Sequence, residues 1–191
     1  MTALIATQSR MGLFSTLAGV ATVFVLRRPP DGARPWRSAL LLTGAIVLLL
    51  GFYGAGVGER FLAAEQASQT RLELYRQVAA MIAERPLLGY GAASFKQAFP
   101  LVHQPTLDPH LVWEYAHSTY LALWSGLGIP IGTLPILLVV VIAARTYRAG
   151  GSDRRSVESS AALGASVTVG LHSLIDFSLE IQAVAFLYAA V

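Results

Sequence analysis

Apolar segments of membrane-spanning length are the feature that most constrains how this chain can fold. A helix needs about 20 predominantly apolar residues to cross the ~30 Å hydrocarbon layer of a bilayer. The segments that approach this length are residues 3–26, 38–57, 119–144 and 159–175. Only 13% of the residues are charged, whereas soluble domains usually carry about 25%. The sequence therefore predicts a multi-pass transmembrane helical bundle of the all-α class.

The apolar segments differ in character. Gly126, Gly128 and Pro130 interrupt the third segment near its middle, which predicts a broken helix. The fourth is rich in Ala, Gly and Ser, a composition that favours close helix–helix packing. Another apolar segment begins at residue 181, but residues 181–191 are too few to cross a bilayer. We therefore predict about four to five spans, the last of them truncated, and expect the natural protein to continue.

Charges in the intervening segments predict an orientation. Residues 27–37 and residues 145–155 each hold four Arg against one Asp. Residues 59–116 hold five basic and six acidic residues. Because short Lys- and Arg-rich loops stay in the cytoplasm, the two Arg-rich segments are predicted to be cytoplasmic and residues 59–116 to lie outside. An even number of crossings separates the two Arg-rich segments, so these assignments agree with each other.

The outer segment itself is predicted to be partly helical. Within residues 70–84 the apolar residues recur at 72, 75, 78, 79 and 82, which is a helical spacing. Pro86 ends this predicted helix because proline disfavours helical geometry at the residue before it. A glycine-bearing turn at residues 89–95 follows.

Several ionisable residues that are far apart in the sequence are brought to the outer face by this topology. An ionisable residue at the edge of a bundle is costly unless it is paired or hydrated, so each is a candidate for function. These residues are Arg10, Arg71, His117, His172 and Asp176.

Simpler interpretations of the two arginines remain open. The presence of Arg10 at the end of the first span would also be explained if its guanidinium extends to the membrane interface (snorkelling). Arg71 would also be explained as a solvated residue in the first turn of a helix. An arginine is poorly placed there because the helix dipole favours anions, so an anion shared between Arg71 and the helix end is the alternative.

The histidines likewise have structural explanations. His117 and Glu114 are spaced as an i,i+3 helix pair, and His172 and Asp176 as an i,i+4 pair. His103 and His110 precede His117 at intervals of seven residues, but prolines interrupt any helix that would align them and the chain has no cysteine. We therefore predict no metal site. The arginines are divided among short loops rather than forming one stripe, so nucleic-acid binding is not predicted.

Four stretches of the chain together resemble the C-terminal part of the O-antigen ligase/polymerase superfamily of bacterial membrane glycosyltransferases. Met11, Ala93 and Ser118 depart from the motifs of that family. In order, the stretches are SRMGLFSTLAGV (9–20), TRLELYRQVAAMIAERPLLGYGAASF (70–95), HSTYLALWSGLGIPIG (117–132) and HSLIDFSLEIQAVAFLYAA (172–190).

The resemblance implies that the protein transfers a glycan from an undecaprenyl-diphosphate-linked donor to an acceptor hydroxyl at the periplasmic face of the bacterial inner membrane. In ligases of the family the acceptor is a sugar of the lipid A core. In polymerases it is the end of another glycan repeat unit, and related members glycosylate protein as O-oligosaccharyltransferases. The resemblance implies neither metal nor cofactor. All three activities remain open at this point, as does a non-catalytic subunit of a membrane transporter.

The resemblance also implies roles for individual residues. Arg10 and Arg71 match the family's two functional arginines, which we expect to bind the diphosphate, and His117 matches its catalytic histidine. An imidazole with a pKa near 6.5 suits a general base at neutral pH.

Four further residues are expected to support the site. Tyr120 lies on the same helix face as His117 and is expected to position a sugar, and Glu114 is expected to orient the imidazole. His172 and Asp176 are expected to assist from the closing span. Residues 1–191 are thus interpreted as one O-antigen ligase-like membrane domain. Family members have further N-terminal spans, so we expect this chain to be a fragment, an incomplete reading frame or a degenerate copy, whose activity on its own is an open question.

Overall fold

The structure is a computed structural model that describes residues 10–27, 44, 57–108, 111–150, 156–176, 179 and 181–190. Every regular element in these residues is helical, so the predicted all-α class is confirmed for the described part of the chain. The elements are α2 (Arg10–Leu26), α4 (Val57–Glu84), α5 (Phe95–Ala98), the 3₁₀ helix η1 (Phe99–Leu101), α6 (Thr119–Ala149), α7 (Val157–His172) and α8 (Gln182–Ala189).

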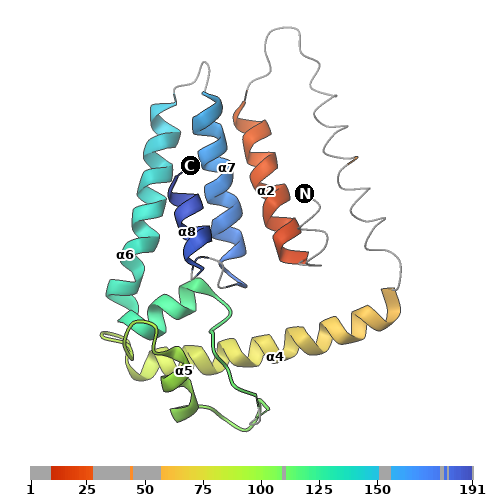
Figure 1. The fold of residues 1–191 in the computed structure, drawn as a ribbon, viewed down its shortest axis with the longest axis vertical. Coiled ribbons are helices and arrows are strands. Elements are labelled where there is room, and N and C mark those ends of the chain that lie inside the picture. Colours follow the sequence, from red (N-terminus) through yellow and green to blue (C-terminus); the bar gives the residue numbers. More distant parts are fainter. Residues whose placement is uncertain are drawn as a thin grey trace.

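Helices α2, α6, α7 and α8 lie alongside one another, and the long helix α4 crosses one end of this group (Figure 1). Helix α7 is central because it contacts α2, α6 and α8. The C-terminal ends of α2 and α6 point away from α4 (Figure 1). The ends that lead to the two Arg-rich segments therefore lie opposite α4, which is the arrangement that the loop charges predict.

Helices α2 and α7 approach each other closely through glycines. A Cβ atom on Gly19 would lie 2.5 Å from the carbonyl oxygen of Gly164 and 1.9 Å from Oγ1 of Thr168. A Cβ on Gly164 would lie 2.8 Å from the carbonyl oxygen of Gly19. The two backbones are therefore in contact, as the small-residue composition of residues 159–175 predicts.

The number of membrane spans is the part of the predicted architecture that the structure does not confirm. Among the described residues, one helix, Thr119–Ala149, is long and apolar enough to cross a membrane, and Phe14–Leu26 is a shorter apolar helix. Helix α7 has 16 residues, because residues 173–175 form a turn instead of continuing the predicted span. Apart from Gly44 and Val57, the predicted span 38–57 lies outside the described residues.

Helix α6 is broken where the sequence predicts a break. Gly128 has φ 77° and ψ 164°, which is non-helical and accessible chiefly to glycine. A Cβ on Gly132 would lie only 2.6 Å from the carbonyl oxygen of Leu123, whereas nine residues of straight helix would separate these positions by about 13.5 Å along the axis. The first part of α6 is therefore sharply bent against the second (Figure 1).

A loop formed by residues 86–91 fills the break in α6. Ile129 N donates to the carbonyl oxygen of Pro86 at 2.7 Å, while Tyr90 N and Gly91 N each donate at 2.8 Å to the carbonyl oxygens of residues 125 and 126. A broken helix leaves backbone groups without i,i+4 partners, and leaving such groups unpaired and buried is costly. The loop supplies those partners and joins the segment after α4 to α6.

The outer segment has an apolar core of its own. Helix α4 buries Leu74, Val78, Met81 and Ile82 against side chains of α5, η1 and the following loop. The helix predicted at residues 70–84 is confirmed as the C-terminal part of α4, which begins earlier, at Val57. The buried face is displaced from the predicted one, because Leu72 is 65% exposed and Leu74 is fully buried.

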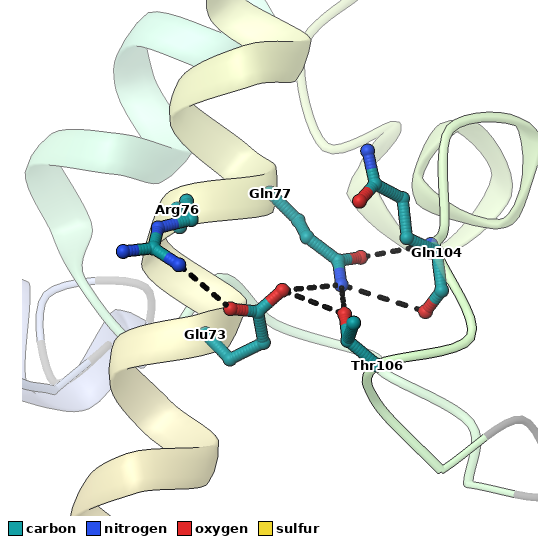
Figure 2. Close-up of polar contacts among 5 residues, drawn as sticks. All are labelled: Glu73, Arg76, Gln77, Gln104 and Thr106. Atoms are coloured by element: carbon teal, nitrogen blue, oxygen red, sulfur yellow. Dashed lines mark hydrogen bonds and ion pairs between the residues drawn. The ribbon is translucent and has the colours of Figure 1, made fainter.

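Polar contacts attach the loop after η1 to α4 (Figure 2). The buried Gln77 donates through Nε2 to Thr106 Oγ1 at 2.8 Å, and Gln104 N donates to Gln77 Oε1 at 3.0 Å. Thr106 Oγ1 also donates to Glu73 at 2.6 Å, and Arg76 lies 3.6 Å from the other carboxylate oxygen. Hydrogen bonds from Thr106 and then Gln77 lower the pKa of Glu73. These contacts position the segment that leads to residues 113–117.

Replacing Gly128 with alanine should destabilise the protein. Gly128→Ala places a Cβ 2.2 Å from the carbonyl oxygen of Leu87 at a positive φ, at a cost of about 1–3 kcal/mol. The measurement is the temperature at which the detergent-solubilised protein loses its size-exclusion peak. Gly170→Ala is the control, because its new Cβ meets only Tyr120 Oη, at 3.7 Å. Equal midpoints for the two variants would contradict the role assigned to the break.

Candidate functional site

His117 lies at the junction between the outer segment and α6. Its backbone has φ +51°, in the left-handed region. The next residue, Ser118, is extended and precedes the first residue of α6. Tyr75 of α4 donates a hydrogen bond from its hydroxyl to the carbonyl oxygen of His117 at 2.6 Å. The half-buried imidazole is thereby placed over α4 at the N-terminal end of α6.

Arg71 and His117 share one pocket. The pocket has a volume of about 210 Å³ and is lined by Thr70, Arg71, Leu74, Trp113 and His117. The Trp113 indole meets the imidazole edge-on, with ring centroids 6.4 Å apart. Two predicted site residues from separate segments of the sequence thus come together, and they do so through α4.

The turn after α7 lies beside the start of α6. His172 Nε2 lies 3.0 Å from Asp176 Oδ2, the i,i+4 pair that the sequence predicts. Thr119 N, at the start of α6, donates to the carbonyl oxygens of Ser173 at 3.0 Å and Asp176 at 3.2 Å. The carbonyl oxygen of Leu174 lies 3.4 Å from the Tyr75 hydroxyl. The end of α7, the start of α6 and the middle of α4 therefore meet at one place.

The electrostatics of this place favour a neutral histidine beside a cation. Burial lowers the pKa of His117, the charge of Arg71 lowers it further, and Asp176 opposes both effects. Burial raises the pKa of Tyr75, an effect that Arg71 opposes and Asp176 reinforces. At neutral pH the imidazole is therefore a proton acceptor, and the Tyr75 hydroxyl keeps its proton and remains a donor.

Two other predicted site residues are placed away from the Arg71 pocket, and a third has no described side chain. Arg10 is the first residue of α2, but its side chain lies outside the described residues. The Glu114 carboxylate pairs with Lys96 Nζ of α5. The Tyr120 hydroxyl donates to the carbonyl oxygen of Gly170 at 2.9 Å, which directs this side chain toward α7 and away from the Arg71 pocket. The sugar-positioning role of Tyr120 and the orienting role of Glu114 stay predictions.

The heptad-spaced histidines do not form a cluster in the part of the chain that is described. His103 packs its ring edge-on against Phe99 of η1, with centroids 5.6 Å apart, and His110 lies outside the described residues. Among the described residues, no group of three His, Cys, Asp or Glu side chains is arranged to hold a metal ion.

A larger apolar cavity lies between α2, α6, α7 and α8. Its volume is about 440 Å³. Thr119 and Ser173, which border it, adjoin the segments that carry His117 and Asp176. Its apolar lining includes Leu26, Leu123, Val139, Leu163 and Val167.

Two residues of the site were not predicted from the sequence. Tyr75 follows Arg71 by four residues, so both lie on one face of α4, and that spacing was a usable signal. Trp113 lies in irregular structure, where no periodicity relates it to His117. Its position depends on the attachment of the outer loop to α4.

Comparison with known proteins identifies the family. No curated protein and no solved structure matches the chain. A family model described as O-antigen ligase matches residues 1–136, a region that contains Arg10, Arg71 and His117. The chain therefore belongs to the O-antigen ligase family of membrane-embedded, glycan-transferring enzymes of polysaccharide assembly.

Proposed function

We propose that this chain carries the donor-binding and base residues of a glycosyltransferase that moves a glycan from undecaprenyl diphosphate to an acceptor hydroxyl at the periplasmic face of the inner membrane. The observation that carries the proposal is the shared pocket of Arg71 and His117. A cation and a neutral imidazole side by side suit a reaction in which one oxygen gains negative charge while another loses a proton.

Arg71 is assigned to the diphosphate of the donor. As the bond between the anomeric carbon and the diphosphate oxygen breaks, the electron pair stays on the leaving diphosphate. A guanidinium remains charged at every physiological pH and binds phosphate oxygens through two parallel hydrogen bonds. A preorganised cation of this kind stabilises the developing charge by about 3–4 kcal/mol, as an oxyanion-hole donor does. Arg10 is assigned to the same diphosphate from α2.

His117 is assigned to the acceptor. The acceptor oxygen forms the new bond to the anomeric carbon, and its proton passes to the imidazole. A base must be unprotonated to act, and burial together with Arg71 holds the pKa of His117 below its ordinary value. The ligase reaction, with a lipid A-core sugar as acceptor, is the specific form that we propose.

The apolar cavity is assigned to the polyprenyl tail. It lies among the upright helices and reaches the Thr119 end of α6, close to the His117 turn. A tail held there would leave the diphosphate at the outer pocket. The fit rests on the location and the apolar lining of the cavity.

The break in α6 bears on the transporter alternative. Discontinuous helices in transporters leave helix ends free to bind substrate or ions. In this chain, residues 86–91 occupy the break with backbone hydrogen bonds, as at Ile129 N and Gly91 N. Backbone groups that are paired within the protein are not offered to a transported ion, so the break favours an anchoring role.

Removing either pocket residue should abolish glycan transfer. In the intact protein, we expect His117→Ala and Arg71→Ala each to lower transfer by at least about 100-fold, the effect typical of losing a general base or a charge-stabilising group. The measurement is transfer of a radiolabelled glycan from polyprenyl diphosphate by membranes containing equal amounts of each variant.

Arg76→Ala is the matched control for these variants. Arg76 lies on the same helix, but its side chain is 79% exposed and pairs with Glu73. It should retain transfer close to that of the unmodified protein. Unchanged transfer by His117→Ala would refute the assignment of His117 as the base. If Arg76→Ala lowers transfer as much as Arg71→Ala does, the positive charge of α4 is required in general and Arg71 has no specific role.

The pH dependence of transfer should reflect the buried histidine. Because the pKa of His117 is lowered, the unprotonated base persists at pH values below its ordinary pKa of about 6.5. The acid limb of a kcat/KM profile should therefore have its midpoint below about 6.5. The profile is measured in detergent at constant ionic strength, and a midpoint above this value would contradict the assignment.

A further inference from the structure

Tyr75 joins the three segments that meet at the outer site. Its hydroxyl lies 2.6 Å from the carbonyl oxygen of His117 and 3.4 Å from that of Leu174. The first distance is short for a hydrogen bond between a hydroxyl and a carbonyl. One side chain of α4 is thus in contact with the turn before α6 and with the turn after α7.

The turn that Tyr75 contacts has an unfavourable backbone conformation. His117 has φ +51°, and a residue with a Cβ pays about 1–2 kcal/mol for the left-handed region. Such a conformation persists only where the surrounding contacts determine it. The hydrogen bond to the His117 carbonyl and those from Thr119 to Ser173 and Asp176 hold the turn on both sides.

Tyr75 also lies on the same helix as Arg71, the cation of the site. Arg71 and Tyr75 are four residues apart on one face of α4, and both adjoin His117. Helix α4 therefore carries the Arg71 and Tyr75 side chains on the side that adjoins the His117 turn. If the hydroxyl holds the His117 backbone, it also sets the separation between imidazole and guanidinium.

We propose that Tyr75 is a positioning residue that holds the His117 turn against α4 and so fixes the imidazole relative to Arg71. We call the hydrogen bond from the Tyr75 hydroxyl to the His117 carbonyl oxygen the clamp. Its effect on transfer rests on the proposed function, but the clamp itself is a structural property that is measurable without catalysis. Tyr75 need not touch substrate. The position of the imidazole matters, because a catalytic group misplaced by about 1 Å can lower the rate on the order of 100-fold.

The kinetic test compares Tyr75→Phe with Tyr90→Phe. Each variant removes one hydroxyl and keeps the ring, but the Tyr90 hydroxyl bonds to Glu84 at the exposed end of α4. We expect kcat of Tyr75→Phe to fall by at least about tenfold, with the KM for the polyprenyl-diphosphate donor nearly unchanged because Arg71 remains. Tyr90→Phe should keep both parameters. A fall in donor affinity at unchanged kcat would overturn the assignment.

The second test measures the histidine directly in the intact protein. The chain has four histidines, so their NMR titrations in lipid nanodiscs can be resolved, and His117→Gln identifies the signal of His117. Arg71 from α4 and Asp176 from the turn after α7 are the charged groups that act on it. In Tyr75→Phe the turn should open to water, and the pKa of His117 should rise toward its ordinary value.

The two tests separate the two proposals. If the pKa of His117 rises in Tyr75→Phe and not in Tyr90→Phe, the clamp is supported. If, in addition, the unmodified protein transfers no glycan, the proposed function fails and the clamp stands. A His117 titration in Tyr75→Phe that is identical to that in Tyr90→Phe overturns the clamp, whatever the transfer activity.

Discussion

The backbone pairing between residues 86–91 and the break in α6 is the interaction on which the outer half of the structure depends. Three hydrogen bonds, including that from Ile129 N to the Pro86 carbonyl, satisfy groups that a broken helix would otherwise leave unpaired. The glycines permit this approach, since a Cβ on Gly128 would collide with Leu87. The pairing anchors the end of α4 to the spanning helix, and the arrangement of the site follows from that anchor.

With α4 anchored, the site forms where the middle of α4 meets the start of α6 and the end of α7. The apolar core beside α4 holds the outer loop, and Gln77 attaches that loop through Thr106. Arg71 remains exposed at the rim of the pocket while His117 is half-buried. An exposed cation next to an imidazole kept neutral by burial is the arrangement on which the proposed glycan transfer rests.

Several features of this arrangement were predictable because they depend on local rules. Helical spacing and Pro86 predicted the C-terminal part of α4 and its end, and the Gly126–Pro130 stretch predicted the break in α6. The structure pairs His172 with Asp176 at the predicted spacing, although residues 173–175 between them form a turn instead of a helix. Longer-range contacts were not predictable: Glu114 pairs with Lys96 of α5, and Tyr120 turns toward α7.

The sequence by itself determined the helical class, the amphipathic outer helix and the residues that identify the family, because hydrophobic periodicity and short motifs are local properties. Only the tertiary structure decided that Arg71 and His117 share a pocket and that the Tyr75 hydroxyl bonds to the His117 turn. The physical reason is that these contacts join segments whose relative position is set by the pairing at the α6 break and by burial. Hydrogen bonds between backbone atoms leave no periodic signal in the sequence, and periodicity marks which face of a helix is buried but not what packs against it.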